Sequence, residues 1–133
     1  MNSNDCSGFE DAGRFLEAIG NWKEPCGPVT YLVVCDRKVS RLQGVSNILY
    51  VGKSEAFGAK NGRLWNYQTA TVNNETEYRV REGAKRLIQK GDSVFLRKCV
   101  TPPNEMTIGA YESYLLGKYE NEHWELPPFN HRK

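Results

Sequence analysis

The chain has few cysteines and histidines, and their spacing does not suit a structural metal site. The four cysteines are spread along the sequence, and the two histidines, His123 and His131, lie far from all of them. A zinc knuckle needs such ligands in closely spaced pairs, so this arrangement argues against one. Cys35 and Cys99 fall in strand-like runs and are expected to be buried free thiols, which suit a reducing compartment.

Long apolar segments are also absent from the sequence. No basic segment followed by an apolar one occurs at the N-terminus, and the longest apolar run extends only from Tyr31 to Cys35. A membrane-spanning helix needs about 20 apolar residues, and an export signal needs a basic segment before its apolar one. We therefore expect a cytoplasmic protein without a membrane span.

A chain of 133 residues can form one domain with one hydrophobic core. Within it we expect an N-terminal helical arm at residues 1–27 and a main domain at residues 28–133. The net charge is +2, but residues 37–98 carry thirteen Lys or Arg against five acids, a net of +8. This excess favours a polyanionic partner, and a solvated basic surface explains it at least as well.

Hydrophobic periodicity predicts an α+β fold. Three strands are expected, at residues 29–35, 47–51 and 93–100. Four helices are expected, at residues 8–19, 61–70, 76–90 and 107–119. After the arm, the order β-β-α-α-β-α gives a small three-stranded antiparallel sheet flanked by helices, with the first strand in the centre. The tail at residues 125–130 is expected to be extended and to pack back through Leu126 and Phe129.

Glu112 interrupts the apolar face of the last predicted helix. Helical spacing places it on one stripe with Ile108, Leu115, Leu116 and Tyr119. A lone carboxylate on such a face needs a positive partner, either an arginine or a metal ion. A magnesium ion fits because it commonly takes only one or two protein carboxylates. The structural alternative is a buried salt bridge with Arg63.

Arg63 and Tyr67 are four residues apart, so they share one face of a predicted helix and could contact the same phosphate. The alternative is a surface arginine beside a core tyrosine, which is about equally common for the pair taken alone.

Taken in order, these residues resemble the GIY-YIG nuclease family. The resemblance rests on Thr30-Tyr31 in the first strand, Tyr50-Val51-Gly52-Lys53 at the end of the second, Arg63 and Tyr67, Glu112, and Asn130. It covers residues 28–130 and is greatest for the small stand-alone phage-type or restriction-type members. Three positions depart from the family pattern, because Val29 and Thr30 stand where glycine and isoleucine are usual, and Val51 replaces the middle isoleucine of the second motif. The resemblance also implies the family's three-stranded sheet.

The resemblance implies a metal-dependent endonuclease that hydrolyses DNA by single-metal water attack, leaving 5′-phosphate and 3′-hydroxyl ends. Its implied catalytic residues are Tyr31, Tyr50, Lys53, Arg63, Tyr67, Glu112 and Asn130. Glu112 would hold Mg²⁺ or Mn²⁺, Tyr31 would act as the general base with Tyr50 orienting the water, and Asn130 would fix Glu112 or a phosphate. A phenol has a reference pKa of about 10, so this base role needs a nearby cation such as Lys53.

The expected partner is double-stranded DNA, and two or more copies of the chain would be needed to span both strands. Candidate phosphate-binding residues are Arg37, Lys38, Arg41, Lys60, Arg79, Lys85, Arg86 and Lys90. One alternative is a non-catalytic nucleic-acid-binding module, which explains the basic excess but not Glu112. Another is an inactive scaffold of the same family that mediates protein contacts.

Overall fold

The sheet is built around one strand that is buried on both faces. The structure, a computed structural model, describes residues 1–23 and 26–131. The first seven residues of β2 (Val29–Ser40) are all buried. β2 pairs antiparallel with β3 (Val45–Ser54) on one side and with β4 (Val94–Cys99) on the other. The expected central strand and its antiparallel hairpin partner are confirmed.

The sheet has four strands, so the prediction of three was wrong. β1 (Glu10–Arg14) pairs antiparallel with β4, and the strand order is β1-β4-β2-β3. The predicted helix at residues 8–19 is also corrected, because α1 (Phe15–Gly20) begins only at Phe15. Gly13 has a φ of +89°, which a helix does not allow. Pairing with the otherwise open edge of β4 outweighs the weak helical pattern, and β1 therefore belongs to the main sheet.

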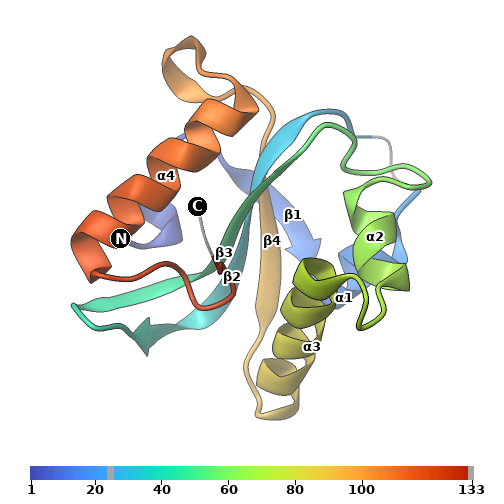
Figure 1. Ribbon diagram of the computed structural model, residues 1–133, viewed down its shortest axis with the longest axis horizontal. Coiled ribbons are helices and arrows are strands. Elements are labelled where there is room, and N and C mark those ends of the chain that lie inside the picture. Colours follow the sequence, from blue (N-terminus) through green and yellow to red (C-terminus); the bar gives the residue numbers. More distant parts are fainter. Residues whose placement is uncertain (24–25, 132–133) are drawn as a thin grey trace.

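The other helices form where the sequence predicted them. They are α2 (Arg63–Thr69), α3 (Glu75–Gln89) and α4 (Ile108–His123), with short 3-10 turns η1 (Ser3–Asp5) and η2 (Pro103–Glu105). Figure 1 shows α4 on one side of the sheet and α1, α2 and α3 on the other. None of the helices in the described ranges has the length and apolar character needed to cross a bilayer.

Each face of the sheet has its own hydrophobic core, because successive strand residues point to opposite faces. The core under α1, α2 and α3 includes Phe15, Tyr31, Val33, Tyr67 and Val80. The core under α4 includes Leu32, Val34, Val51, Leu115 and Tyr119. The fold is therefore an α+β sandwich of three layers, with the sheet in the middle.

The C-terminal tail covers part of the open edge of β3. The Phe129 amide donates to the Leu49 carbonyl at 2.9 Å, and the Asn130 side chain makes two bonds of 3.0 Å to the Val51 backbone. The Phe129 ring packs so closely on Gly83 of α3 that a side-chain carbon there would lie 2.6 Å from it. The tail thus pairs the free backbone groups of an edge strand, and its predicted packing through Phe129 is confirmed.

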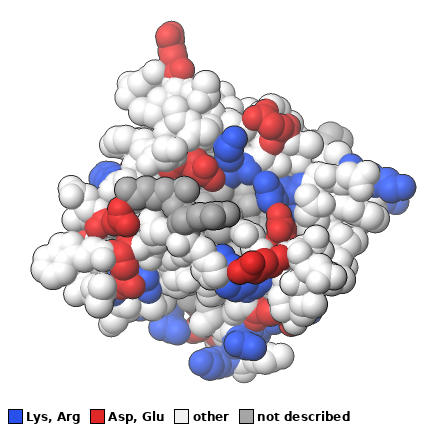
Figure 2. Space-filling model, viewed as in Figure 1, with Lys and Arg blue, Asp and Glu red and all other residues white. Residues whose placement is uncertain are grey.

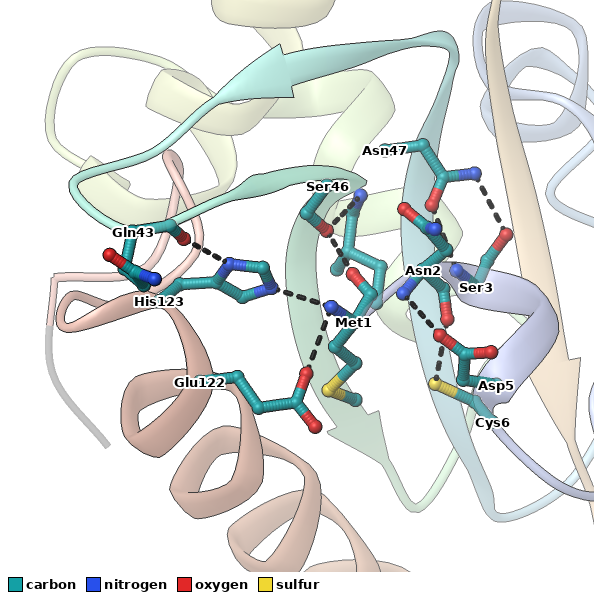
Figure 3. A network of polar contacts seen from close by, with 11 residues as sticks. Met1, Asn2, Ser3, Asp5, Cys6, Gln43, Ser46, Asn47, Glu122 and His123 are labelled. Carbon is teal, nitrogen blue, oxygen red and sulfur yellow. Dashed lines mark hydrogen bonds and ion pairs between the residues drawn. The ribbon is translucent and has the colours of Figure 1, made fainter.

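The far end of the hairpin is tied to the end of α4 by a network around the N-terminus (Figure 3). The Met1 amino group lies 2.7 Å from Nε2 of His123 and 2.9 Å from Glu122. Nδ1 of the same histidine lies 2.7 Å from the Gln43 carbonyl. His123 is buried, and both of its ring nitrogens have partners, so it has a structural role here.

Candidate functional site

The hairpin brings the two tyrosine motifs together on one face of the sheet. Tyr31 in β2 lies opposite Gly52 in β3, and Thr30 lies opposite Lys53. The register shifts by one residue near Leu49 and Tyr50, and both side chains pack on the core under α1, α2 and α3. Tyr50 lies opposite Val33, two residues from Tyr31, so regular alternation places both rings on the same face, and their centroids are 6.0 Å apart.

Gly52 makes room for these two rings. A side-chain carbon added at Gly52 would lie 2.7 Å from Cζ of Tyr31 and 2.7 Å from Cε2 of Tyr50. No real carbon tolerates such a distance, so any larger residue would displace one ring. The groups that approach this glycine closely are therefore the phenols of the site itself.

Tyr31 and Tyr67 form a buried pair. Their hydroxyls lie 2.7 Å apart, and both side chains are fully buried. Burial raises the pKa of Tyr31 well above its usual value, the phenols of Tyr67 and Tyr50 add to the rise, and the opposing effect of Arg63 is smaller. Burial also raises the pKa of Tyr67. At neutral pH both phenols are therefore protonated, which means that Tyr31 could act as a base only with added positive charge nearby.

Arg63 lies at the start of α2 and is held by two groups. Its Nη1 donates to Oε1 of Glu77 in α3 at 2.6 Å, and its Nη2 donates to the backbone carbonyl of Lys53 at 3.3 Å. The salt bridge between Arg63 and Glu112 that was the structural alternative does not form. Glu77, which the sequence analysis missed, is the carboxylate that takes the arginine. Only the three-dimensional fold reveals this pairing, because the two residues sit on different helices.

Glu112 projects from α4 and is half-buried. Within residues 1–23 and 26–131, its carboxylate has no hydrogen bond and no ion pair within 4.0 Å. Burial raises its pKa above the usual value, although the charges of Lys53 and Arg63 act in the opposite direction. Both cations are thus close enough for their fields to be felt without contacting the carboxylate.

The start of α4 is fixed to the sheet beside this carboxylate. The Thr30 hydroxyl donates to the Ile108 carbonyl at 2.9 Å, and Thr107 caps the helix by accepting from the Ala110 amide at 3.0 Å. Lys53 reaches over the first turn, since a side-chain carbon added at Gly109 would lie 3.6 Å from its Nζ. The register between Thr30 and Lys53 therefore also sets the position of Glu112 relative to Lys53.

The residues around Glu112 suit a hard divalent cation held at a single anchor. Mg²⁺ and Mn²⁺ prefer oxygen ligands, and Mg²⁺ usually keeps several of its waters. The half-buried carboxylate of Glu112, which has no partner in the described part of the chain, offers such a ligand, whereas the carboxylate of Glu77 is already bound to Arg63. The donor set therefore fits one ion anchored by Glu112 and completed by water and substrate oxygens.

A second group of possible metal ligands lies at the other end of the buried part of β2. Ligand atoms of Cys35, Asp36 and Asp92 all lie within 4.8 Å of one another. Arg37 donates to Asp92 at 2.8 Å, and the Ser93 amide donates to Asp36 at 3.1 Å. Burial raises the pKa of the Cys35 thiol, so it stays protonated. These partners make this group less suited to Mg²⁺ than the free carboxylate of Glu112.

Asn130 does not contact Glu112 in this structure. Its Oδ1 accepts from the Val51 amide, and its Nδ2 donates to the Val51 carbonyl, so both ends of the amide are used on β3. The predicted contact with Glu112 is therefore corrected. Because Val51 lies between Tyr50 and Gly52, Asn130 instead holds the strand that carries the second tyrosine motif.

The predicted phosphate-binding residues separate into two groups. Those that are exposed are Arg37, Lys38, Lys60, Lys85, Arg86 and Lys90. Arg41 and Arg79 instead turn inward, which corrects their placement on the binding surface. Arg41 bonds to Glu125 at 2.9 Å and to the Leu126 carbonyl at 2.8 Å. Arg79 donates to the Phe129 carbonyl at 2.7 Å, and its charge lowers the pKa of Tyr50, although burial of this phenol raises that pKa more.

The surface around the site carries charges of both signs. Figure 2 shows acidic and basic side chains close together between α4 and the helices on the other side of the sheet. The basic excess of residues 37–98 therefore does not form a uniformly basic face in this view.

No protein-family model, no curated protein and no solved structure matches the chain. The case for a function is therefore made from the arrangement of the residues.

Proposed function

We propose that the protein is a divalent-metal-dependent endonuclease that hydrolyses DNA phosphodiester bonds. The observation that carries the proposal is the half-buried carboxylate of Glu112, which has no ion pair within the described ranges, while Arg63 beside it is held by Glu77. An unpaired carboxylate lowers the stability of a fold, so its presence next to cations and phenols supports a functional role.

Each residue of the site has a chemical part in this proposal. Arg63 and Lys53 would bind the non-bridging oxygens of the phosphate and offset the charge that develops there. Tyr50 would orient the attacking water, and Tyr31, paired with Tyr67, would take its proton. An ion held by Glu112 would supply Lewis acidity toward the phosphate and the leaving oxygen, giving 5′-phosphate and 3′-hydroxyl ends.

The base role of Tyr31 depends on positive charge that arrives with the metal ion. Burial keeps the pKa of this phenol high, so the free protein holds it protonated at neutral pH. A divalent cation at Glu112 would favour the phenolate by electrostatic attraction. The activity should therefore increase as the pH rises.

We further propose that the chain is a small member of the GIY-YIG family, in which β1 extends the expected three strands. The support is the ordered set Tyr31, Tyr50, Arg63, Tyr67 and Glu112. The charge of the Arg63 guanidinium acts on each of the other four. Double-stranded DNA is the proposed substrate, and two copies acting together would be needed to cut both strands. Four free cysteines are compatible with a reducing, cytoplasmic setting.

Incubation of supercoiled plasmid with the purified protein and Mg²⁺ tests this function. We expect nicked or linear product that disappears when EDTA is added. Retarded but intact plasmid, with and without the metal ion, would instead support the non-catalytic binding module. If the plasmid is neither cut nor retarded, the inactive scaffold remains as the explanation.

A further inference from the structure

Among the residues that the structure describes, the charge of Arg63 acts on the carboxylates of Glu77 and Glu112, but Arg63 contacts that of Glu77 alone. The bond to Glu77 is 2.6 Å long, whereas the influence of Arg63 on Glu112 is purely electrostatic. Nε of Arg63 is buried and has no hydrogen-bond partner among the described residues. The guanidinium therefore keeps one unused donor, at Nε, on a part that is shielded from water.

An ion pair between Arg63 and Glu112 would be the natural competitor for this arrangement. Both groups are half-buried, and opposite charges attract more strongly when they are partly removed from water. Such a pair would occupy the carboxylate with guanidinium donors. It would also block the oxygen atoms that a divalent cation needs.

We propose that Glu77 is a positioning residue that keeps Arg63 away from Glu112 and so leaves the Glu112 carboxylate open to a divalent cation. This inference rests on the proposed function, in which the open carboxylate of Glu112 binds a metal ion. Glu77 itself touches neither the metal ion nor the substrate.

The surroundings of Glu77 allow it to hold the arginine. It lies in the first turn of α3, where the helix dipole favours a negative charge. Its side chain is 19% exposed and that of Arg63 is 27% exposed, so the bond between them is sheltered from solvent. The Lys53 carbonyl holds the second arm of the guanidinium at 3.3 Å, and this fork fixes the plane of the group.

Binding of Mn²⁺ alone, measured by titration calorimetry without DNA, tests the inference. In Glu77→Ala we expect the Mn²⁺ affinity to fall by about tenfold, as when a residue that orients a ligand is removed. Glu77→Gln should give a smaller fall in the same direction and serves if the alanine variant does not fold. Adding Arg63→Met to Glu77→Ala should restore the affinity, because no guanidinium remains to occupy Glu112.

Glu82 provides the matched control. It lies on the same helix and is paired with Arg81 at 3.0 Å, so Glu82→Ala also removes an acidic partner of an arginine. Its Mn²⁺ affinity should equal that of the unaltered protein. A general loosening of α3 would lower the affinity in both variants, and Arg63→Met would not restore it.

A measurement without metal separates this inference from the proposed function. A double-mutant cycle compares the denaturation midpoints of Arg63→Met, Glu112→Gln and the variant that carries both changes. The shifts give the coupling free energy between Arg63 and Glu112. We expect weak coupling in the unaltered protein and clear, favourable coupling in the Glu77→Ala background. Equal coupling in both backgrounds, or full Mn²⁺ affinity in Glu77→Ala, would overturn the inference. Absence of any Mn²⁺ binding by the unaltered protein would instead count against the proposed function.

Discussion

The two ends of the β2–β3 hairpin use charged residues in opposite ways. At the closed tip, Arg41 is paired with Glu125 and His123 uses both ring nitrogens, one of them on the Met1 amine. At the open end, Glu112 is half-buried and has no partner among the residues that the structure describes, and Lys53 and Arg63 stand near it without contact. Both ends contain acids, bases and aromatic rings. The difference is that the charged groups Arg41 and Glu125 at the tip are paired with each other, whereas Glu112 has no such pair among the described residues, and this makes the open end the candidate site.

The strongest way to test this contrast is to neutralise the unpaired acid. Glu112→Gln keeps the size of the side chain but removes the charge that would hold the metal ion. We expect the rate of plasmid cutting to fall by about a thousandfold, equivalent to several kcal/mol of lost transition-state stabilisation. DNA affinity, measured by fluorescence anisotropy, should stay nearly unchanged. Cutting at the original rate would remove Glu112 from the mechanism.

The pH dependence of cutting tests the phenols at the open end. Because the pKa of Tyr31 is raised, its phenolate is scarce at neutral pH, and its fraction grows by about tenfold per pH unit below that pKa. The cutting rate with Mg²⁺ should therefore increase from neutral to alkaline pH. Tyr31→Phe should be slow and should lose this slope. A flat profile for the unaltered protein would contradict the assignment of Tyr31 as the base.

Arg41 tests the opposite expectation at the closed tip. Its side chain is only 11% exposed and bonds to Glu125 and to the Leu126 carbonyl, so its loss leaves two partly buried acceptors without this donor. Arg41→Ala should lower the free energy of unfolding by about 1–3 kcal/mol. The cutting rate per folded molecule should not change. Denaturant titration and the plasmid assay together check this, and loss of cutting in a stable variant would show that the two ends are not separate.

The exposed cations of α3 should have the smallest effects. Lys85 and Arg86 are exposed, and a contact of either with a phosphate would release about one counterion. Each single change to glutamine should reduce the slope of log affinity against log salt by about 1. Binding titrations at several salt concentrations measure that slope. If neither substitution changes this slope, DNA does not contact this helix.

Much of the fold followed from sequence patterns because those patterns were strong. The apolar run that begins at Val29 predicted the central strand, and the hydrophobic periodicity of residues 76–90 predicted α3, in which Val80 and Ala84 are buried. β1 could not be predicted in this way. It has only 5 residues, four of them exposed, and what defines it is pairing with β4 rather than a periodic pattern. Short edge strands of this kind depend on a partner that lies far away in the sequence.

The candidate site was predictable in its members but not in their pairing. The spacing of Arg63 and Tyr67 placed both on one helix face, and the hydroxyl of Tyr67 does meet that of Tyr31. The choice of Glu77 over Glu112 as the partner of Arg63 depends on how α2 packs against α3. The turn of Arg79 toward the tail likewise depends on tertiary packing. Sequence spacing within one element carries no such information.

A crystal soaked in Mn²⁺ tests the central claim most directly, because the anomalous signal locates the ion. The account predicts one ion at the Glu112 carboxylate, on the side of Lys53 and Arg63. An ion found instead at Cys35, Asp36 and Asp92, with none at Glu112, would contradict it.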